Sequence, residues 1–221
     1  MTAAPAIAPP TVLVTGFDPF DGASLNPSWE AARALHGQDI NGHRVVAGQL
    51  PTDFARSLPA LEALLRAHAP RLVVCCGLAG GRAAISLERV AINVQDARIP
   101  DNAGARPVDE AIVPGAEAPA AYFTSLPIKA MRRALQDAGI ATEVSQTAGT
   151  FVCNHVFYGL MHHLATRGPT TARGGFVHVP WLPGQGAPSM PPAQVVQGLR
   201  LAIACALATP VDIRAEGGAL D

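Results

Sequence analysis

The stretch TVLVTGFDPFDGASLNPSWEAARALHG, residues 11–37, determines how the fold begins. Its apolar run Thr11–Thr15 is typical of a buried strand that ends at a glycine. Asn26 and Pro27 then indicate the start of a helix, with Asn26 as the N-cap and Pro27 at the first helical position. We expect this helix to end near His36. A strand followed closely by a helix is the repeating unit of α/β folds.

The same alternation continues along the rest of the chain. We expect further strands at residues 43–50, 71–76, 85–94, 140–145 and 176–179, and further helices at 53–68, 128–138, 153–166 and 192–207. Strands that alternate with helices predict an α/β fold, here a three-layer α/β/α sandwich with a mostly parallel, twisted mixed sheet. The extended stretch 85–122 is long for a connection between helices, and such insertions often carry function.

The domain organisation follows from the absence of repeats and of any linker-like change in composition. We therefore expect a single α/β domain over residues 11–215. Residues 1–10 (MTAAPAIAPP) lack the positive start and continuous apolar stretch of a signal peptide, and they are interpreted as a disordered tail. No segment has the roughly 18 uninterrupted apolar residues expected of a membrane span.

The charge balance argues against polyanionic partners. The formal net charge is -1 and no basic run occurs, so neither nucleic acid nor an anionic membrane surface is an expected partner. The four cysteines match no zinc-binding spacing, and without a secretory signal they are expected as free thiols in a reducing cytoplasm. One of them can then be catalytic.

Cys153 is the leading candidate among these thiols. It follows the loop TAGTFV and stands at the start of a helical pattern, so the unpaired N–H groups of a helix N-terminus would favour its thiolate. The neighbouring amides could also stabilise an oxyanion. From position alone, however, a lone cysteine is more often a small buried hydrophobic residue.

His178 is the leading candidate for a base. It lies at the end of the strand FVHV, and the strand ends of parallel sheets open onto active sites. The competing histidines are His36, His43, His68, His155, His162 and His163. Most of these fall near helix ends, where a histidine is usually solvated, and His155 points away from the residue two before it.

Glu88 is the most informative carboxylate. Period-2 alternation places it on the same strand face as the apolar residues that follow it, where a charge needs a partner. A structural ion pair with Arg89 or Arg98 is one interpretation. The other is a histidine that Glu88 orients, as the third member of a chain of nucleophile, base and orienting group.

Two other patterns are weak signals for a binding site. The loop GLAGGR after the strand at 71–76 has no GK[ST] and leads into a strand, so it is weak evidence for a phosphate site. Cys153 with the histidines of the following helix lacks the ligand spacing of a metal site. We therefore expect neither a metal nor a cofactor.

Four long motifs carry a resemblance to a known family. They are TGFDPFDGASLNPS (15–28), GLAGGRAAISLERVAINVQDARIPDN (77–102), SQTAGTFVCN (145–154) and FVHVPWLPGQ (176–185). In this order they resemble the pyroglutamyl peptidase I family of cysteine peptidases (C15), which remove pyroglutamate from peptide N-termini. The resemblance covers nearly the whole chain, and it implies a phosphorylase/hydrolase-like sheet arrangement.

The resemblance also implies roles for individual residues. Glu88, Cys153 and His178 match the family's catalytic triad, and Phe17 and Phe20 match the aromatic residues that pack on the pyrrolidone ring. The other positions that it places in the substrate pocket are Thr52, Arg98, Ile99, Phe151 and Val152.

Two positions bear on specificity and catalysis within that family. Arg98 resembles the arginine near the reacting carbonyl. Leu78 stands where several bacterial members carry Gln, so a side-chain amide contact with the substrate is absent here. The selectivity of the pocket is therefore open at Leu78.

The resemblance predicts a cytoplasmic exopeptidase acting on peptides with an N-terminal pyroglutamate, without a cofactor and assembled as a homotetramer. The alternatives are a non-catalytic protein that binds blocked N-termini or another small lactam, and a nucleoside-processing enzyme of similar layout. An intact triad argues against the first, and the lack of a phosphate-binding motif argues against the second.

Overall fold

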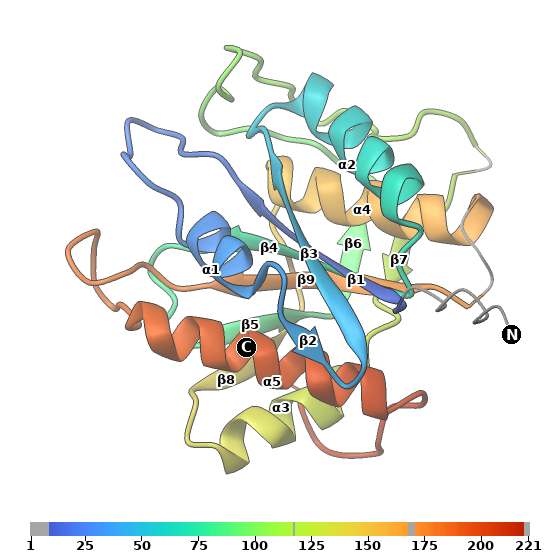
Figure 1. Ribbon diagram of the computed structural model, residues 1–221. Coiled ribbons are helices and arrows are strands. Elements are labelled where there is room, and N and C mark those ends of the chain that lie inside the picture. Colours follow the sequence, from blue (N-terminus) through green and yellow to red (C-terminus); the bar gives the residue numbers. More distant parts are fainter. Residues whose placement is uncertain (1–8, 117, 168–170, 219–221) are drawn as a thin grey trace, which may run out of the picture.

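The structure is a computed structural model that describes residues 9–116, 118–167 and 171–218. Its centre is a seven-stranded sheet (Figure 1). In spatial order the strands are β2 (Asp39–Ile40), β3 (His43–Leu50), β1 (Thr11–Phe17), β4 (Leu72–Leu78), β9 (Arg173–Val179), β5 (Ile85–Glu88) and β8 (Thr142–Ser145). The pairs β3–β1, β1–β4, β4–β9 and β5–β8 are parallel, whereas β2–β3 and β5–β9 are antiparallel. The prediction of a mostly parallel mixed sheet is confirmed.

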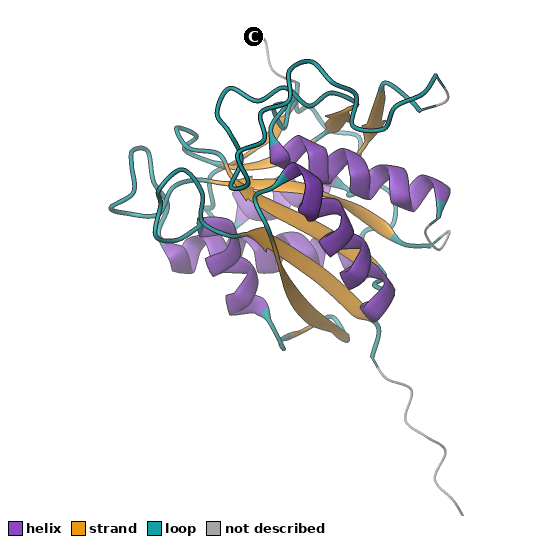
Figure 2. Cartoon of the chain, turned by 90° about the horizontal axis from the view of Figure 1, so that it is seen from above, coloured by secondary structure: helices purple, strands orange, loops and turns teal. Residues whose placement is uncertain are grey.

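Helices cover both faces of this sheet and complete three layers (Figures 1 and 2). One face carries α2 (Phe54–His68) and α4 (Val152–Thr166), and the other carries α1 (Pro27–Leu35), α3 (Ile128–Asp137) and α5 (Pro192–Ala208). Alternate residues of the central strands therefore enter two different apolar cores. On β1, for example, Leu13 packs in the core under α2 and α4, while Val12 and Val14 pack in the other.

The helix starts follow the signals in the sequence. The Asn26 side chain accepts a hydrogen bond from the Ser28 N–H at 3.1 Å and begins α1, and Asp53 accepts one from the Arg56 N–H at 2.9 Å and begins α2. Both caps lie beside the cavity described below. The local chemistry that begins these helices thus also fixes the walls of the site.

The prediction of one continuous strand over 85–94 is wrong. The chain leaves the main sheet at Arg89, whose N–H bonds the Ser145 carbonyl and whose carbonyl accepts the Thr124 N–H. The following β6 (Val90–Ile92) pairs instead with β7 (Ala121–Phe123) in a separate two-stranded sheet. All four residues of β5 are buried, because β5 lies between β9 and β8. The position of β5 within the sheet therefore explains the burial of Glu88, and an alternating pattern that continues to Val94 does not.

Some expectations about the ends of the chain stay predictions. The tail predicted at residues 1–10 falls mostly on residues 1–8, which lie outside the described residues, and the single-domain organisation over 11–215 is likewise a prediction. The short strands β2 and β7 were not predicted, because two or three residues give no measurable period. Across the parts of the chain that the structure describes, no helix is long and apolar enough to cross a membrane.

Candidate active site

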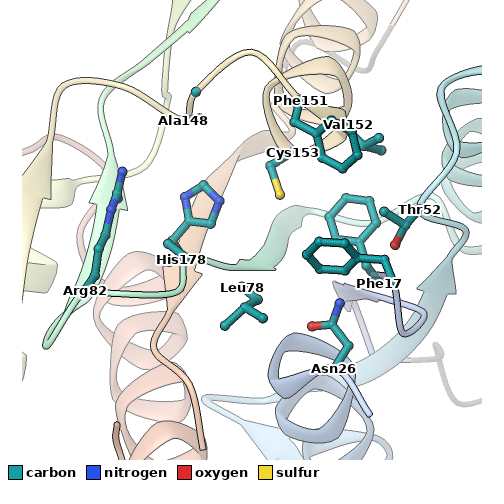
Figure 3. A pocket seen from close by; sticks show the side chains of 13 residues that line it. Phe17, Asn26, Thr52, Leu78, Arg82, Ala148, Phe151, Val152, Cys153 and His178 are labelled. Atoms are coloured by element: carbon teal, nitrogen blue, oxygen red, sulfur yellow. The ribbon is translucent and has the colours of Figure 1, made fainter. Parts of the chain in front are cut away.

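An open cavity of about 210 Å³ lies at the carboxyl ends of β1, β4 and β9, beside the first turn of α4 (Figure 3). This is the edge at which parallel α/β sheets commonly bind ligands. The cavity is small compared with the roughly 300–1,000 Å³ of common ligand pockets, which suits a single small residue. Its lining residues are Phe17, Phe20, Asn26, Thr52, Leu78, Ala79, Arg82, Ala148, Gly149, Phe151, Val152, Cys153 and His178.

Cys153 is the second residue of α4, and its side chain points into this cavity (Figure 3). Phe151 is the N-cap and has extended backbone angles, and no side chain caps the helix. In α4 the His155 N–H donates to the Phe151 carbonyl. Cys153 lies before His155, in the first turn, where backbone N–H groups have no acceptor within the helix. Gly77 lies directly beneath the thiol, because a Cβ at that position would be 2.7 Å from Cys153 Sγ. The close fit fixes the position of the sulfur.

His178, which lines the cavity, forms a buried hydrogen bond with Glu88 behind it. The antiparallel pairing of β5 with β9 brings Glu88 Oε1 to 2.8 Å from His178 Nδ1, and both side chains are almost completely buried. A carboxylate accepts, so Nδ1 donates its hydrogen and Nε2 keeps its lone pair. His178 lines the same cavity as Cys153, so the imidazole can act there as a base.

Arg82 is a part of the site that the sequence did not predict. Its Nη1 lies 2.8 Å from the same oxygen of Glu88, and it comes from the loop that follows β4. The sequence suggested Arg89 or Arg98 as the ion-pair partner of Glu88. That interpretation is wrong, because the arginine that pairs with Glu88 is Arg82. Arg89 instead donates to the Gln146 side chain, 2.9 Å away. A loop residue six positions before Glu88 gives no periodic signal that would identify the contact.

The electrostatic environment keeps the Cys153 thiol protonated. Burial raises the pKa of Cys153 to about 12, and the nearby negative charge of Glu88 adds to this effect, whereas Arg82 opposes it. We expected the helix N-terminus to favour the thiolate. Desolvation opposes that preference, so a base that takes the thiol proton assists the attack.

Aromatic side chains form one wall of the cavity. The ring centroid of Phe151 lies 6.2 Å from that of Phe20 and 5.4 Å from that of Phe54, which contacts it edge-on. Phe17 and the buried Thr52 complete this wall, and the Thr52 hydroxyl donates to the Asp18 carbonyl. The rings that line the cavity itself, those of Phe17, Phe20 and Phe151, make a flat apolar slot.

The structure does not bring all of the expected pocket residues together. Five of the seven expected substrate-binding residues line the cavity, namely Phe17, Phe20, Thr52, Phe151 and Val152. Arg98 is exposed and Ile99 is half-buried, and neither is a lining residue. Leu78 does line the cavity and presents an aliphatic side chain to it (Figure 3).

Several lining residues were missed because their signals had another meaning. The pattern around Asn26 indicates only a helix cap, and Ala148 and Gly149 belong to the loop before Cys153, in which the sequence singles out only the cysteine. His155, which was considered as a partner for Cys153, is buried and packs edge-on against Phe54 at 5.4 Å.

Comparisons with known proteins agree with this geometry. A sequence profile of the family described as pyroglutamyl peptidase matches residues 10–209. A pyrrolidone-carboxylate peptidase of Cupriavidus taiwanensis is 56% identical over 216 residues, covering 96% of this chain and 99% of that protein. One from Streptomyces coelicolor is 52% identical over 214 residues, covering 94% of this chain and 98% of that protein.

Solved structures give the same result. The crystal structure of pyroglutamyl peptidase I from Bacillus amyloliquefaciens superposes with a TM-score of 0.90 at 44% identity, covering 94% of this chain and all of that one. A mutant pyrrolidone carboxyl peptidase from Pyrococcus furiosus superposes with a TM-score of 0.86 at 41% identity, covering 91% of this chain and 100% of that one.

Proposed function

The chain belongs to the pyroglutamyl peptidase family, and from this premise we propose that it removes an N-terminal pyroglutamyl residue from peptides, with Cys153 as nucleophile. His178 is the general base and Glu88 orients it. One observation carries the assignment: His178, which is hydrogen-bonded to the buried Glu88, lines the same small cavity as a cysteine at the N-terminus of α4. This is the arrangement of nucleophile, base and orienting group that covalent catalysis requires.

The reaction begins with proton transfer from the thiol. A thiol with a pKa of about 12 is almost entirely protonated at neutral pH, so Nε2 of His178 takes the proton as Sγ attacks the pyroglutamyl carbonyl carbon. Glu88 stabilises the imidazolium that forms, through the hydrogen bond to Nδ1. The N–H of Cys153 at the start of α4 can donate to the oxyanion.

The intermediate then collapses and the leaving group departs. His178 returns its proton to the nitrogen of the departing amine as the peptide C–N bond breaks, which leaves a thioester on Cys153. A water molecule gives a proton to Nε2 and adds to the thioester carbonyl. Cleavage of the C–S bond releases pyroglutamate, and the proton returns to the sulfur.

The apolar wall gives a physical reason for selectivity. Pyroglutamate is a neutral lactam, so it can enter a slot formed by Phe17, Phe20 and Phe151 without burying a charge. An ordinary N-terminal residue would have to desolvate its ammonium group there, at a cost of several kcal/mol. We retain Arg98 and Ile99 as proposed substrate contacts, which would require the loop that carries them to approach the bound peptide.

The test is hydrolysis of a pyroglutamyl reporter beside a prolyl reporter, which lacks the lactam carbonyl. We expect release from the first only, and no turnover above background for Cys153→Ala. The matched control is Cys205→Ser on α5, a cysteine remote from the cavity, which should keep wild-type turnover. Near wild-type activity in Cys153→Ala would contradict the assignment.

Assembly and location are also proposals. The resemblance supports a homotetramer, which light scattering coupled to size-exclusion chromatography can measure. A reducing compartment such as the cytoplasm suits an enzyme with a thiol nucleophile, and Cys75, Cys76, Cys153 and Cys205 are all free. Fractionation of the native cells tests the location.

A further inference from the structure

Arg82 connects two parts of the site that are far apart in the sequence. Its Nη1 donates to Glu88 Oε1 at 2.8 Å and to Ser145 Oγ at 3.3 Å, and its Nη2 donates to the Thr147 carbonyl at 3.1 Å. Ser145 is the last residue of β8, and Thr147 lies in the segment that leads from β8 to Cys153. One guanidinium therefore bonds both the carboxylate of the candidate triad and the backbone that delivers the nucleophile.

Glu88 has an unusual need for this contact. Its side chain is fully buried, and among the described residues its Oε2 has no hydrogen-bond partner. A buried carboxylate is stable as an ion only where a positive group or several donors compensate for lost hydration. Within the described parts of the chain, Arg82 and His178 are the two residues that form ion pairs with it.

We infer that Arg82 is a positioning residue, which keeps Glu88 ionised and oriented toward His178 and holds the Cys153 segment in register with that pair. The inference rests on the proposed function, because it assigns Arg82 a part in that reaction. Arg82 makes no bond to Cys153 or His178. It acts through Glu88 and through the segment that leads to the thiol.

The consequence is a predictable effect on pH dependence. The charged or titratable groups that face His178 are Glu88 on β5, Arg82 on the loop after β4 and Cys153 on α4, with Cys75 on β4 near the thiol. The two 2.8 Å contacts share one oxygen, so Arg82 Nη1 and His178 Nδ1 are at most about 5.6 Å apart. Protonation of the Glu88–His178 pair adds positive charge beside Arg82, whichever atom holds the proton.

Arg82 therefore opposes this protonation, and its removal should make the pair take up a proton at higher pH. The active form is the one with ionised Glu88 and neutral His178. The acid limb of kcat/KM must then move to higher pH when the charge of Arg82 is lost. We expect a shift of about one pH unit, since Arg82 is partly exposed to solvent.

The experiment compares Arg82→Met with Arg82→Lys and with Arg89→Met. Arg89 adjoins Glu88 in sequence, but its side chain bonds Gln146 and does not line the cavity. The Arg89→Met substitution therefore removes the same charge without removing a contact with Glu88. The pH dependence of kcat/KM on a pyroglutamyl reporter is the first measurement. The rate of Cys153 alkylation by iodoacetamide against pH is the second, and it needs no substrate.

Arg82→Met should move the acid limb up by about one unit in both profiles and lower the optimum kcat/KM by roughly tenfold or more. Arg82→Lys should restore the wild-type limb, because the charge is kept, with a smaller loss at the optimum. Arg89→Met should match the wild type. An unshifted limb in Arg82→Met, or an equal shift in Arg89→Met, overturns the inference.

Two further outcomes are separable. If Arg82→Met does not fold, as judged by circular dichroism, Arg82→Gln takes its place, because it should show the same shift of the acid limb while keeping donors for Thr147. If neither variant folds, Arg82 is a structural residue and the inference is rejected. If the wild type releases no pyroglutamate, the proposed function fails, while the alkylation profiles still decide the role of Arg82.

Discussion

A single methyl group at Gly77 should disable the site. Gly77 lies on β4 opposite His178 of β9, and a Cβ built there would be 2.7 Å from Cys153 Sγ and 2.9 Å from the Phe176 ring. Ordinary contact begins at 3.4 Å, so the sulfur would have to move by about 0.7 Å. Misplacement of reacting atoms by about 1 Å can cost about a hundredfold in rate. We therefore expect Gly77→Ala to lower kcat/KM roughly 10- to 100-fold.

The same substitution overpacks the core beneath α4. Such changes typically cost about 1–3 kcal/mol of stability, which corresponds to a fall in Tm of roughly 3–10 °C for a chain of this size. The assay is hydrolysis of a pyroglutamyl reporter well below the measured Tm of the variant. At that temperature the variant is folded, and any remaining loss of kcat/KM reflects the displaced thiol.

Gly174→Ala is the matched control for this experiment. Gly174 lies near the start of β9, away from the cavity, and a Cβ there would be 3.0 Å from the Leu164 side chain and 3.2 Å from the Val73 carbonyl. It should reduce the Tm and keep kcat/KM. Wild-type kcat/KM in Gly77→Ala, or an equal loss in Gly174→Ala, would refute the reasoning about the position of the sulfur.

Three further predictions concern the charges of the site and its surroundings. Glu88→Gln keeps the shape of the side chain but removes the charge that stabilises protonated His178, so kcat/KM should fall at least about 100-fold, measured with circular dichroism as a fold control. In His178→Ala, the rate of Cys153 alkylation by iodoacetamide should be slow at pH 7 and rise about tenfold per pH unit, because the thiol pKa is raised to about 12. Mass spectrometry of the labelled peptide measures this rate, and a plateau below pH 9 would contradict the prediction. Burial lowers the pKa of His155 to about 4, so its contribution to stability is complete above the unfolded pKa of about 6.5 and is lost as pH falls toward 4. Urea unfolding should therefore show a loss of about 3 kcal/mol between pH 7 and pH 4 that His155→Leu removes.

Much of the fold could be predicted because its signals are local. The caps Asn26 and Asp53 begin α1 and α2 as expected, since a side-chain oxygen two or three residues before a free N–H is a short-range feature. The strand 43–50 was predicted with its observed bounds, because apolar residues and flanking turns define it. Cys153 and His178 stood out for similar reasons, at a helix start and a strand end.

What could not be predicted depends on contacts between distant segments. At the break after Glu88 the Arg89 N–H donates to the Ser145 carbonyl and the Arg89 carbonyl accepts from the Thr124 N–H, and no local pattern records these contacts. Alternation through residue 94 suggested one strand, although β5 and β6 belong to different sheets. The ion pair of Arg82 with Glu88 was invisible for the same reason, because the loop GLAGGR has no period from which a side-chain direction can be inferred.

The raised pKa of Cys153 changes which part of the site must carry the chemistry. A cysteine peptidase with a preformed thiolate depends on its helix N-terminus, and its base acts chiefly on the leaving group. Here burial raises the pKa of the Cys153 thiol, so we expect the attack to depend on a proton acceptor. The strength of that acceptor is set by Glu88 and, through Glu88, by Arg82. Substitutions of Glu88 or Arg82 should therefore change the rate of acylation, measured as the burst of reporter release, rather than only the hydrolysis of the thioester.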